Sequence, residues 1–210
     1  EEYFGGTMKD SRRIRQRAAD ARQAVVIGSG FIGMEVAAVL AQRKIEVTMV
    51  FPEERIWQHF FTPEMSAFFQ HYYQARGVRF RPQAKVTAFQ GNGEVRKVVL
   101  DSREELPADL VVAGIGVEPV VDPFEDIGFT IQNGLVVNEF LETPMAGVYA
   151  AGDVANYKDL LFGRQRRFEH WDNAVSQGQY LAHALTGQHE PYLHVPYFFS
   201  DEFDLSYEFW

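Results

Sequence analysis

The sequence predicts an α/β chain in which a parallel sheet, an antiparallel meander and helices follow one another. Three observations predict this class. Short apolar runs at residues 24–27, 46–51 and 110–113 are typical of parallel strands buried on both faces. Residues 31–43 carry helical periodicity between the first two runs, which indicates a strand–helix–strand unit. From residue 85 to 110 the pattern changes to antiparallel strands joined by a glycine-rich turn.

The remaining elements are bounded by residues with known local preferences. Thr62 is the expected N-cap of a helix that ends at Gly77. Short strands are expected at residues 135–137 and 148–150, and a last clear helix at residues 171–185.

Composition excludes several classes of partner. The chain has 210 residues, a formal net charge of −9 and no apolar run long enough to cross a bilayer. Neither a nucleic acid nor a membrane is therefore an expected partner. The one basic cluster, residues 11–17, is interpreted as the solvated face of a helix.

Several kinds of site are also excluded. The absence of cysteine rules out a disulfide framework and a CxxC motif within these residues. The six histidines lack metal-binding spacing, so no metal site is expected. The sequence contains no GxSxG motif, so a hydrolase is not predicted. No targeting segment is visible, so a cytoplasmic location is expected, although residues 1–6 resemble a fragment's end more than a natural start.

The strongest local signal is the motif Gly28-Ser29-Gly30-Phe31-Ile32-Gly33, which follows an apolar strand and opens a helix. In this context Gly28 permits a tight turn, Gly30 leaves room for a pyrophosphate, and Gly33 lets helix and strand approach. The helix N-terminus offers free N–H groups and the positive end of a dipole to phosphates. The motif predicts a dinucleotide site in a Rossmann-type unit.

Acidic residues near this motif are candidate ligands of the same dinucleotide. Phe51 occupies the strand end where an acid for the adenosine ribose is expected, and Glu53 follows. Glu53 either reaches the ribose or lies in an exposed loop. Arg55 is the lone cation there, which favours NADH over NADPH. Glu35, in the first turns of the glycine-loop helix, either interacts with the helix dipole or faces the nicotinamide.

Two later segments carry further candidates. Residues 143–153 form a short strand pattern that ends in Gly152-Asp153, where a carboxylate can accept hydrogen bonds from a polyol. The polar and aromatic run at residues 166–174 enters the last helix. Either Asp172 or Asn173 caps that helix and Trp171 packs in the core, or the helix N-terminus points at a flavin edge.

Taken together, these residues resemble the pyridine nucleotide-disulfide oxidoreductases, in which an NAD domain is inserted into an FAD domain. The segments that resemble the plant monodehydroascorbate reductases are residues 47–53, 93–95, 196–200 and 203–206. Those that resemble apoptosis-inducing factor are residues 51–53, 163–170 and 185–187. The resemblance extends from about residue 10 to the end of the chain.

The resemblance implies two cofactor sites. The NAD site would comprise Gly28, Gly30, Phe31, Ile32 and Gly33 at the pyrophosphate, Phe51 and Glu53 towards the adenosine, Glu35 and Glu169 near the nicotinamide, and Gly114 and Gly116 along the cleft. The FAD site would comprise Gly152 and Asp153 at the ribityl and phosphate portion, with His170 and Trp171 near the isoalloxazine. No catalytic side chain is expected, because the cofactors supply the chemistry.

The chain departs from the family pattern in two places. It lacks the first FAD glycine fingerprint, so an N-terminal FAD half is a missing partner. Phe199-Ser200-Asp201 replaces an aromatic-Tyr-Ser-Arg stretch that the resemblance associates with the ascorbyl substrate, which places that substrate in doubt.

The sequence therefore predicts an α/β, Rossmann-type NAD(H)-binding domain at residues 1–120, the C-terminal part of a split FAD-binding domain at 121–190, and the start of an interface domain at 191–210. The expected function is transfer of hydride from NADH to FAD and then of electrons to a small-molecule acceptor or small redox protein. The alternatives are an NADH-binding redox sensor of the apoptosis-inducing-factor type and a disulfide reductase.

Overall fold

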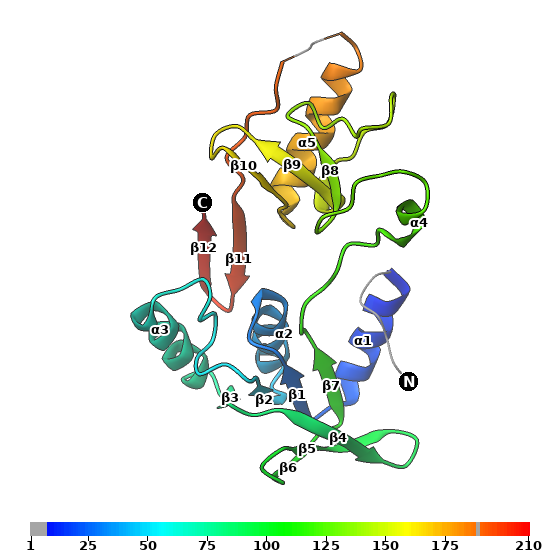
Figure 1. Cartoon of the computed structure of the whole chain (residues 1–210). Helices are drawn as coiled ribbons and strands as arrows, with labels where there is room; N and C mark the ends of the chain where they lie inside the picture. The colour runs from blue at the N-terminus through cyan, green and yellow to red at the C-terminus, as the bar shows by residue number, and fades with distance from the viewer. Residues whose placement is uncertain (1–7, 188–189) are drawn as a thin grey trace. The chain divides into compact units, whose positions relative to one another are not determined.

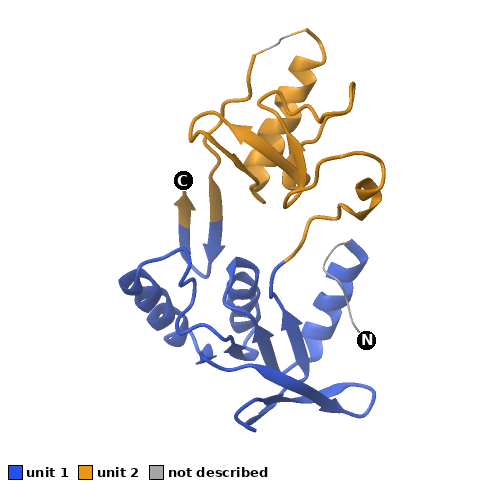
Figure 2. Cartoon of the chain, in the orientation of Figure 1, with its two compact units in different colours: residues 1–116, 200–206 blue, residues 117–199, 207–210 orange. Residues whose placement is uncertain are grey.

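A computed structural model describes residues 8–187 and 190–210, so the predicted fragment end at residues 1–6 lies outside the described residues. The chain divides into two compact units (Figures 1 and 2). Unit 1 comprises the chain up to Gly116 together with Ser200–Ser206, and unit 2 comprises Val117–Phe199 and Tyr207–Trp210. Each unit is described by itself below.

Unit 1 is built on a four-stranded parallel sheet with the strand order β3-β2-β1-β7 (Figure 1). The strands are β1 (Gln23–Ile27), β2 (Glu46–Val50), β3 (Arg79–Arg81) and β7 (Leu110–Ala113). β1 is central and apolar, and Val25 and Val26 are fully buried because both faces of the sheet are covered. This arrangement confirms the predicted α/β class and the three predicted strands.

The two faces of the sheet carry different layers. Helix α2 (Phe31–Gln42) packs against β1, β2 and β7. The meander of β4 (Val86–Gly91), β5 (Val95–Leu100) and β6 (Glu105–Pro107) is antiparallel. Its side chains Val98, Leu100 and Leu106 share a buried cluster with Val25 and Val50. Since Val25 faces the meander, the alternation of a strand turns Val26 towards α2.

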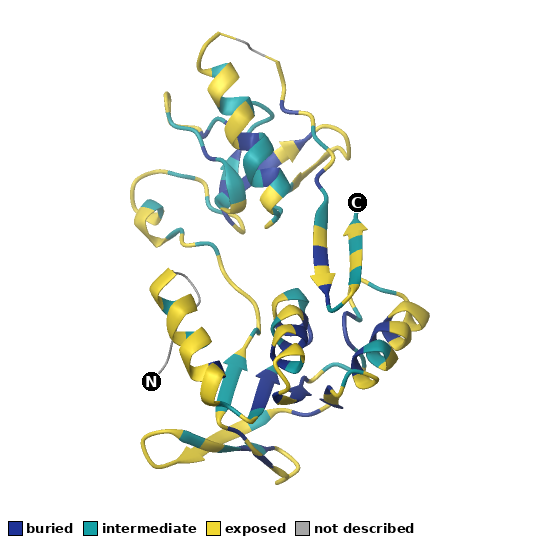
Figure 3. Cartoon of the chain, turned by 180° about the vertical axis from the view of Figure 1, so that it is seen from behind, coloured by how far each residue is buried: buried dark blue, intermediate teal, exposed yellow. Residues whose placement is uncertain are grey.

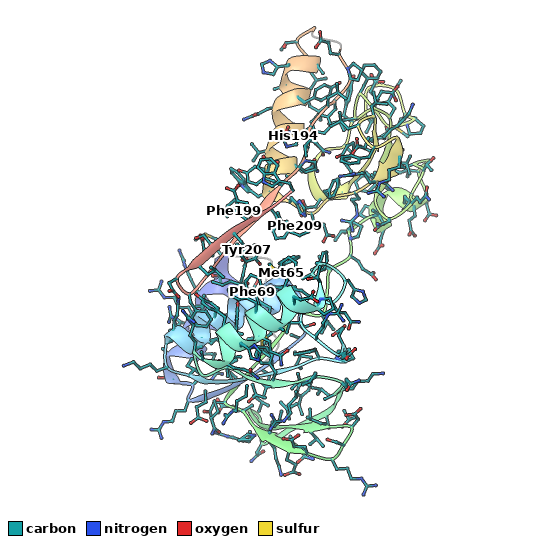
Figure 4. All side chains as sticks on the ribbon, turned by 90° about the vertical axis from the view of Figure 1, so that its left-hand side faces the viewer. Met65, Phe69, His194, Phe199, Tyr207 and Phe209 are labelled. Carbon is teal, nitrogen blue, oxygen red and sulfur yellow. The ribbon has the colours of Figure 1, made fainter. Side chains whose placement is uncertain are left out.

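Two further helices complete unit 1. Helix α3 (Pro63–Gln74) begins at the predicted N-cap, where Thr62 Oγ1 accepts a hydrogen bond from the Met65 N–H. One turn apart on α3, Met65 is exposed and Phe69 is buried (Figure 4). Helix α1 (Met8–Asp20) carries the basic cluster and is exposed along most of its length (Figure 3).

Unit 2 is a smaller α/β assembly. Its sheet has the order β10-β9-β8, formed by β8 (Leu135–Val137), β9 (Ala155–Asp159) and β10 (Arg164–Arg166). Helix α5 (Trp171–Ala184) packs Tyr180 and Leu181 against a core that includes Leu135, Val137 and Tyr157. A short helix, α4 (Asp122–Glu125), and the 3-10 turn η1 (Gly152–Val154) complete the unit.

The prediction of a strand at residues 148–150 is wrong. Only an isolated bridge forms there, between Glu142 and Tyr149. The chain turns tightly at Gly147, whose φ is +79°, and Thr143 Oγ1 donates to the Val148 carbonyl at 2.8 Å. The ladder strand is instead β9, which begins at Ala155, directly after the 3-10 turn that contains Gly152 and Asp153, and pairs in parallel with β8.

The final residues form a hairpin of β11 (Phe198–Glu202) and β12 (Leu205–Phe209). Phe199 lies on the first strand, and Tyr207 and Phe209 lie on the second (Figure 4). Within residues 8–187 and 190–210, no helix combines the length and the apolar character that crossing a bilayer requires.

Candidate functional site

Three glycines of unit 1 are required by the packing of the protein itself. Gly28, at the end of β1, has a φ of +108°, and a Cβ there would lie 2.2 Å from the Gly114 carbonyl oxygen. A Cβ on Gly33 would lie 2.5 Å from the Gly28 carbonyl oxygen, and one on Gly114 would lie 3.1 Å from the Gly33 nitrogen. The loop, the start of α2 and the end of β7 therefore meet backbone to backbone.

Gly30 differs from these three. It is the N-cap of α2, with φ −79° and ψ −179°, a conformation open to any residue. No atom lies within 4 Å of the position that its Cβ would take. No side chain caps α2, so the first N–H groups of the helix have no capping side chain as acceptor. The space and its donors fit a phosphate-bearing ligand.

The acid predicted for the adenosine side lies at the glycine loop. Ser29 Oγ donates a hydrogen bond to Glu53 Oε2 at 3.2 Å, so the chain after β2 curls back to the motif. Phe51, by contrast, is fully buried, with its ring edge on Phe80. Of the two candidates at this strand end, only Glu53 lies where a loop-bound ligand can reach it.

The two apolar residues of the motif occupy different surroundings. The ring of Phe31 lies between those of Trp57 and Phe60, at centroid distances of 5.6 and 5.1 Å. Ile32 is largely exposed. Gly116, at the end of unit 1, has a φ of +111° and open space at its Cβ position.

Glu35 has a partner that the sequence did not indicate. Its side chain is on the exposed side of α2, and Ser200 Oγ donates a hydrogen bond to Glu35 Oε1 at 2.6 Å. Ser200 belongs to unit 1 and is 165 residues away in the chain. No local pattern links the two residues.

In unit 2, two predicted residues line one cavity. Asp153 and Glu169 border a space of about 320 Å³ together with Val154, Arg167 and residues 117–120. Arg167 Nη1 donates to Glu169 Oε1 at 2.5 Å and to the Asp153 carbonyl at 2.8 Å. Asp153 lies in η1 and is exposed, so its carboxylate is open to a ligand.

The turn before Asp153 is held by a side chain. Gly152 has a φ of +79°, and its N–H donates to Gln177 Oε1 at 2.7 Å. Gln177 lies on α5 and is fully buried. This bond ties the predicted ribityl-binding turn to the helix that begins at Trp171, and no local sequence pattern indicates it.

The start of α5 differs from the interpretation in which its first residues cap the helix and pack in the core. The N-cap is His170, and its side chain makes no capping hydrogen bond. Trp171 is 70% exposed, so the alternative in which it packs in the core is wrong. Neither Asp172 nor Asn173 is the cap, because Asp172 pairs with His194 at 2.5 Å and Asn173 accepts from Tyr192 Oη at 3.2 Å.

The surroundings of His170 shift the pKa of its imidazole. Burial lowers the pKa of its imidazole, although the nearby carboxylates of Asp153, Asp172 and Glu169 act in the opposite direction. Its Nδ1 is buried without a hydrogen-bond partner in the part of the chain that the structure describes.

Both arginines of the run at residues 166–174 are occupied within unit 2. Arg166 pairs with Asp159 at 3.1 Å, and its guanidinium lies over the ring of Phe168. Arg167 pairs with Glu169. Over the described residues, no group of three or more His, Cys, Asp or Glu side chains could hold a metal ion.

The chain is similar to known oxidoreductases over most of its length. Residues 1–178 match the family described as pyridine nucleotide-disulphide oxidoreductase. Monodehydroascorbate reductase 4 (peroxisomal) of Arabidopsis thaliana is 40% identical over 194 residues, which is 89% of this chain and 39% of that protein. The rubredoxin-NAD(+) reductase of Pseudomonas putida is 34% identical over 93% of this chain and 51% of that protein.

A solved structure shows the same architecture. The ferredoxin reductase for the CYP199A2 system of Rhodopseudomonas palustris has a TM-score of 0.91 and 35% identity, over 96% of this chain and 50% of that one. The chain thus spans from 39% to about half of the length of these relatives. Such relatives depend on FAD and a pyridine nucleotide.

Proposed function

Because the chain belongs to the pyridine nucleotide-disulphide oxidoreductase family, we propose that it is the NADH-binding portion of an FAD-dependent oxidoreductase, joined to the second part of the FAD site. Gly30 carries the proposal. Its backbone angles and its surroundings within the chain do not require glycine, whereas a pyrophosphate at the uncapped start of α2 does. When bound, the nicotinamide supplies a hydride and the flavin accepts it and passes electrons on.

The residues of unit 1 would bind and orient the nucleotide. The N–H groups at the start of α2 would hold the pyrophosphate, and Glu53, fixed by Ser29, would accept from the adenosine ribose. A carboxylate at that position repels a 2′-phosphate, which supports NADH over NADPH. Glu35 would face the nicotinamide region.

The residues of unit 2 would hold the flavin. Asp153 would accept from the ribityl hydroxyls, on a turn fixed by Gln177 and Arg167. The uncapped start of α5 would present N–H groups beside His170 and the exposed Trp171. Glu169 borders the same cavity as Asp153 and would lie near the nicotinamide amide.

We assign the domains as residues 1–120 for NAD(H) binding, 121–190 for the FAD part and 191–210 for the start of an interface domain. An N-terminal FAD half, a small electron acceptor or redox protein and a cytoplasmic location complete the proposal. The names of two relatives contain rubredoxin and ferredoxin, which supports a redox-protein acceptor. Since Arg166 and Arg167 are both paired and Asp201 replaces an arginine, an ascorbyl anion fits less well.

Two alternatives predict different kinetics. A redox sensor like apoptosis-inducing factor would bind NADH but turn over slowly with artificial acceptors such as ferricyanide. A disulfide reductase requires a cysteine pair, which would lie in the N-terminal half, because residues 1–210 contain no cysteine. Steady-state turnover of the full-length protein with ferricyanide, a quinone and a disulfide distinguishes the three.

Titration calorimetry with Gly30→Val tests the nucleotide site. The wild-type chain should bind NADH more tightly than NADPH, and the variant should lose affinity by about 100-fold or more, because a side chain fills the pyrophosphate space. Gly178→Val, at another glycine with open space, is the matched control and should bind NADH normally. Tighter NADPH binding, or unchanged NADH binding by Gly30→Val, would contradict the assignment.

An absorption spectrum tests the flavin site. The purified 210-residue chain should be colourless, because only the second part of the FAD site is present. The full-length protein should show flavin bands. A stoichiometric flavin spectrum from the 210-residue chain would overturn the proposal of a split site.

A further inference from the structure

The hydroxyl of Ser200 is directed at a carboxylate of the nucleotide-binding unit. Ser200 is 2% exposed, and its Oγ donates to Glu35 Oε1 at 2.6 Å. Hydrogen bonds from a hydroxyl to a carboxylate are among the stronger ones. The bond therefore fixes the orientation of Glu35.

Ser200 is held in place independently of Glu35. In the turn of the β11–β12 hairpin, Asp204 Oδ1 accepts from Tyr72 Oη and from Arg76 Nη2, both at 2.5 Å. The ring of Phe203 packs edge-on against Tyr73 at 5.0 Å. These contacts attach the hairpin turn to α3, so Ser200 is a fixed donor to which the longer Glu35 side chain adjusts.

Glu35 keeps a second oxygen for another donor. Its Oε2 receives no hydrogen bond from residues 8–187 or 190–210, and it lies on the exposed side of α2. Glu35 lies one turn into α2, whereas Glu53 is bonded to Ser29, before the helix begins. The free oxygen thus belongs to a residue one helical turn beyond the loop that Glu53 contacts.

We propose that Ser200 is a positioning residue that holds the Glu35 carboxylate to accept a hydrogen bond from the carboxamide N–H of the nicotinamide. The inference rests on the proposed function and adds to it a contact that selects between dinucleotides. The ligand class is a pyridine dinucleotide whose ring carries an amide donor. The affinity of analogues without that donor should not depend on Ser200.

Calorimetry on the full-length protein in its oxidised state tests this inference with three ligands. NAD⁺ carries the carboxamide, 3-acetylpyridine adenine dinucleotide replaces it with a group that cannot donate, and ADP-ribose lacks the ring. Ser200→Ala should weaken NAD⁺ binding about five- to tenfold, because Glu35 loses its fixed orientation. Binding of the acetylpyridine analogue and of ADP-ribose should be unchanged.

Ser206→Ala is the matched control. Ser206 lies on the same hairpin and donates to Asp201 at 2.6 Å, so its loss removes a comparable bond that does not involve Glu35. Ser200→Thr retains the hydroxyl and should restore most of the NAD⁺ affinity. Ser206→Ala should leave all three affinities at their wild-type values.

The outcomes separate the inference from the proposed function. If the wild-type protein binds neither NAD⁺ nor ADP-ribose, the proposed function itself fails. If it binds both and Ser200→Ala leaves the ratio of the two affinities unchanged, the positioning role is refuted. An equal loss for all three ligands would show that Ser200 only supports the fold, and would refute it too.

Discussion

The candidate sites of the two units are built in opposite ways. In unit 1 the loop before α2 is shaped by the backbone, through Gly28, Gly33 and Gly114 in direct contact. In unit 2 the turn before β9 is shaped by side chains, because Gln177 holds the Gly152 N–H and Arg167 holds the Asp153 carbonyl. Neither α2 nor α5 has a side-chain cap.

The difference shows which kind of change each site tolerates. In the backbone-built loop, a side chain added at Gly28 or Gly33 clashes with a carbonyl oxygen. The turn held by side chains depends instead on one amide and one guanidinium, in a unit that also contains His170, whose pKa is lowered by burial. Three experiments test this contrast.

The largest effect is expected for Gly28→Val. The new side chain would clash with the Gly114 carbonyl and would require a positive φ of a β-branched residue. Unit 1 should lose about 3–5 kcal/mol of stability in urea unfolding followed by circular dichroism. Gly30→Val, two residues on, should stay within about 1 kcal/mol of wild type, since open space surrounds it. Equal losses of stability in the two variants would show that Gly28 and Gly30 do not differ in what the packing of unit 1 requires.

An intermediate effect is expected for Gln177→Leu. The substitution leaves the Gly152 N–H without its acceptor, which costs about 1–3 kcal/mol. Unit 2 should unfold at lower urea, and the full-length protein should retain less FAD. Gln179→Leu, exposed on the same helix, is the matched control and should change neither quantity. Parallel behaviour of the two variants would argue that Gln177 does not hold the turn.

The smallest effect concerns pH. Because burial lowers the folded-state pKa of His170 below its ordinary 6.5, the folded chain binds fewer protons than the unfolded chain near that pH. The resulting stability is fully present above pH 6.5 and is lost as the pH falls towards the folded-state pKa. His170→Phe keeps a ring between Phe168 and Phe198 and should reduce the loss measured between pH 7.5 and 5.5. A pH dependence identical in both proteins would exclude His170 as its source.

Elements defined by short stretches of sequence could be predicted well. The strand–glycine loop–helix pattern of residues 24–43 and the Thr62 cap depend on neighbours in the chain, and the structure has both. The strand at residues 148–150 failed because its apolar residues serve the packing of a tight turn. Val148 and its neighbours satisfy their backbone groups within the turn instead of in a ladder.

The contacts that shape the candidate sites could be predicted less well. Gln177 and Ser200 resemble ordinary polar residues in the sequence, and their partners lie 25 and 165 residues away. For Trp171 the sequence left two alternatives open, core packing or a place at the flavin, and the exposed side chain excludes the first. The roles of the predicted cofactor residues remain predictions until the binding experiments above are done.

The return of Ser200–Ser206 to unit 1 also bears on synthesis by the ribosome. The part of unit 1 up to Gly116 is made first, and the remaining part of unit 1, Ser200–Ser206, follows only after roughly 80 further residues have been added. At about 5–20 residues per second, the nascent segment waits several seconds for Ser200 to reach Glu35 and for Asp204 to reach Arg76. During that interval the face of α3 that later receives Phe203 has no covering chain from the hairpin. A ribosome stalled before residue 200 would therefore carry unit 1 with its parallel sheet complete and that face of α3 still open.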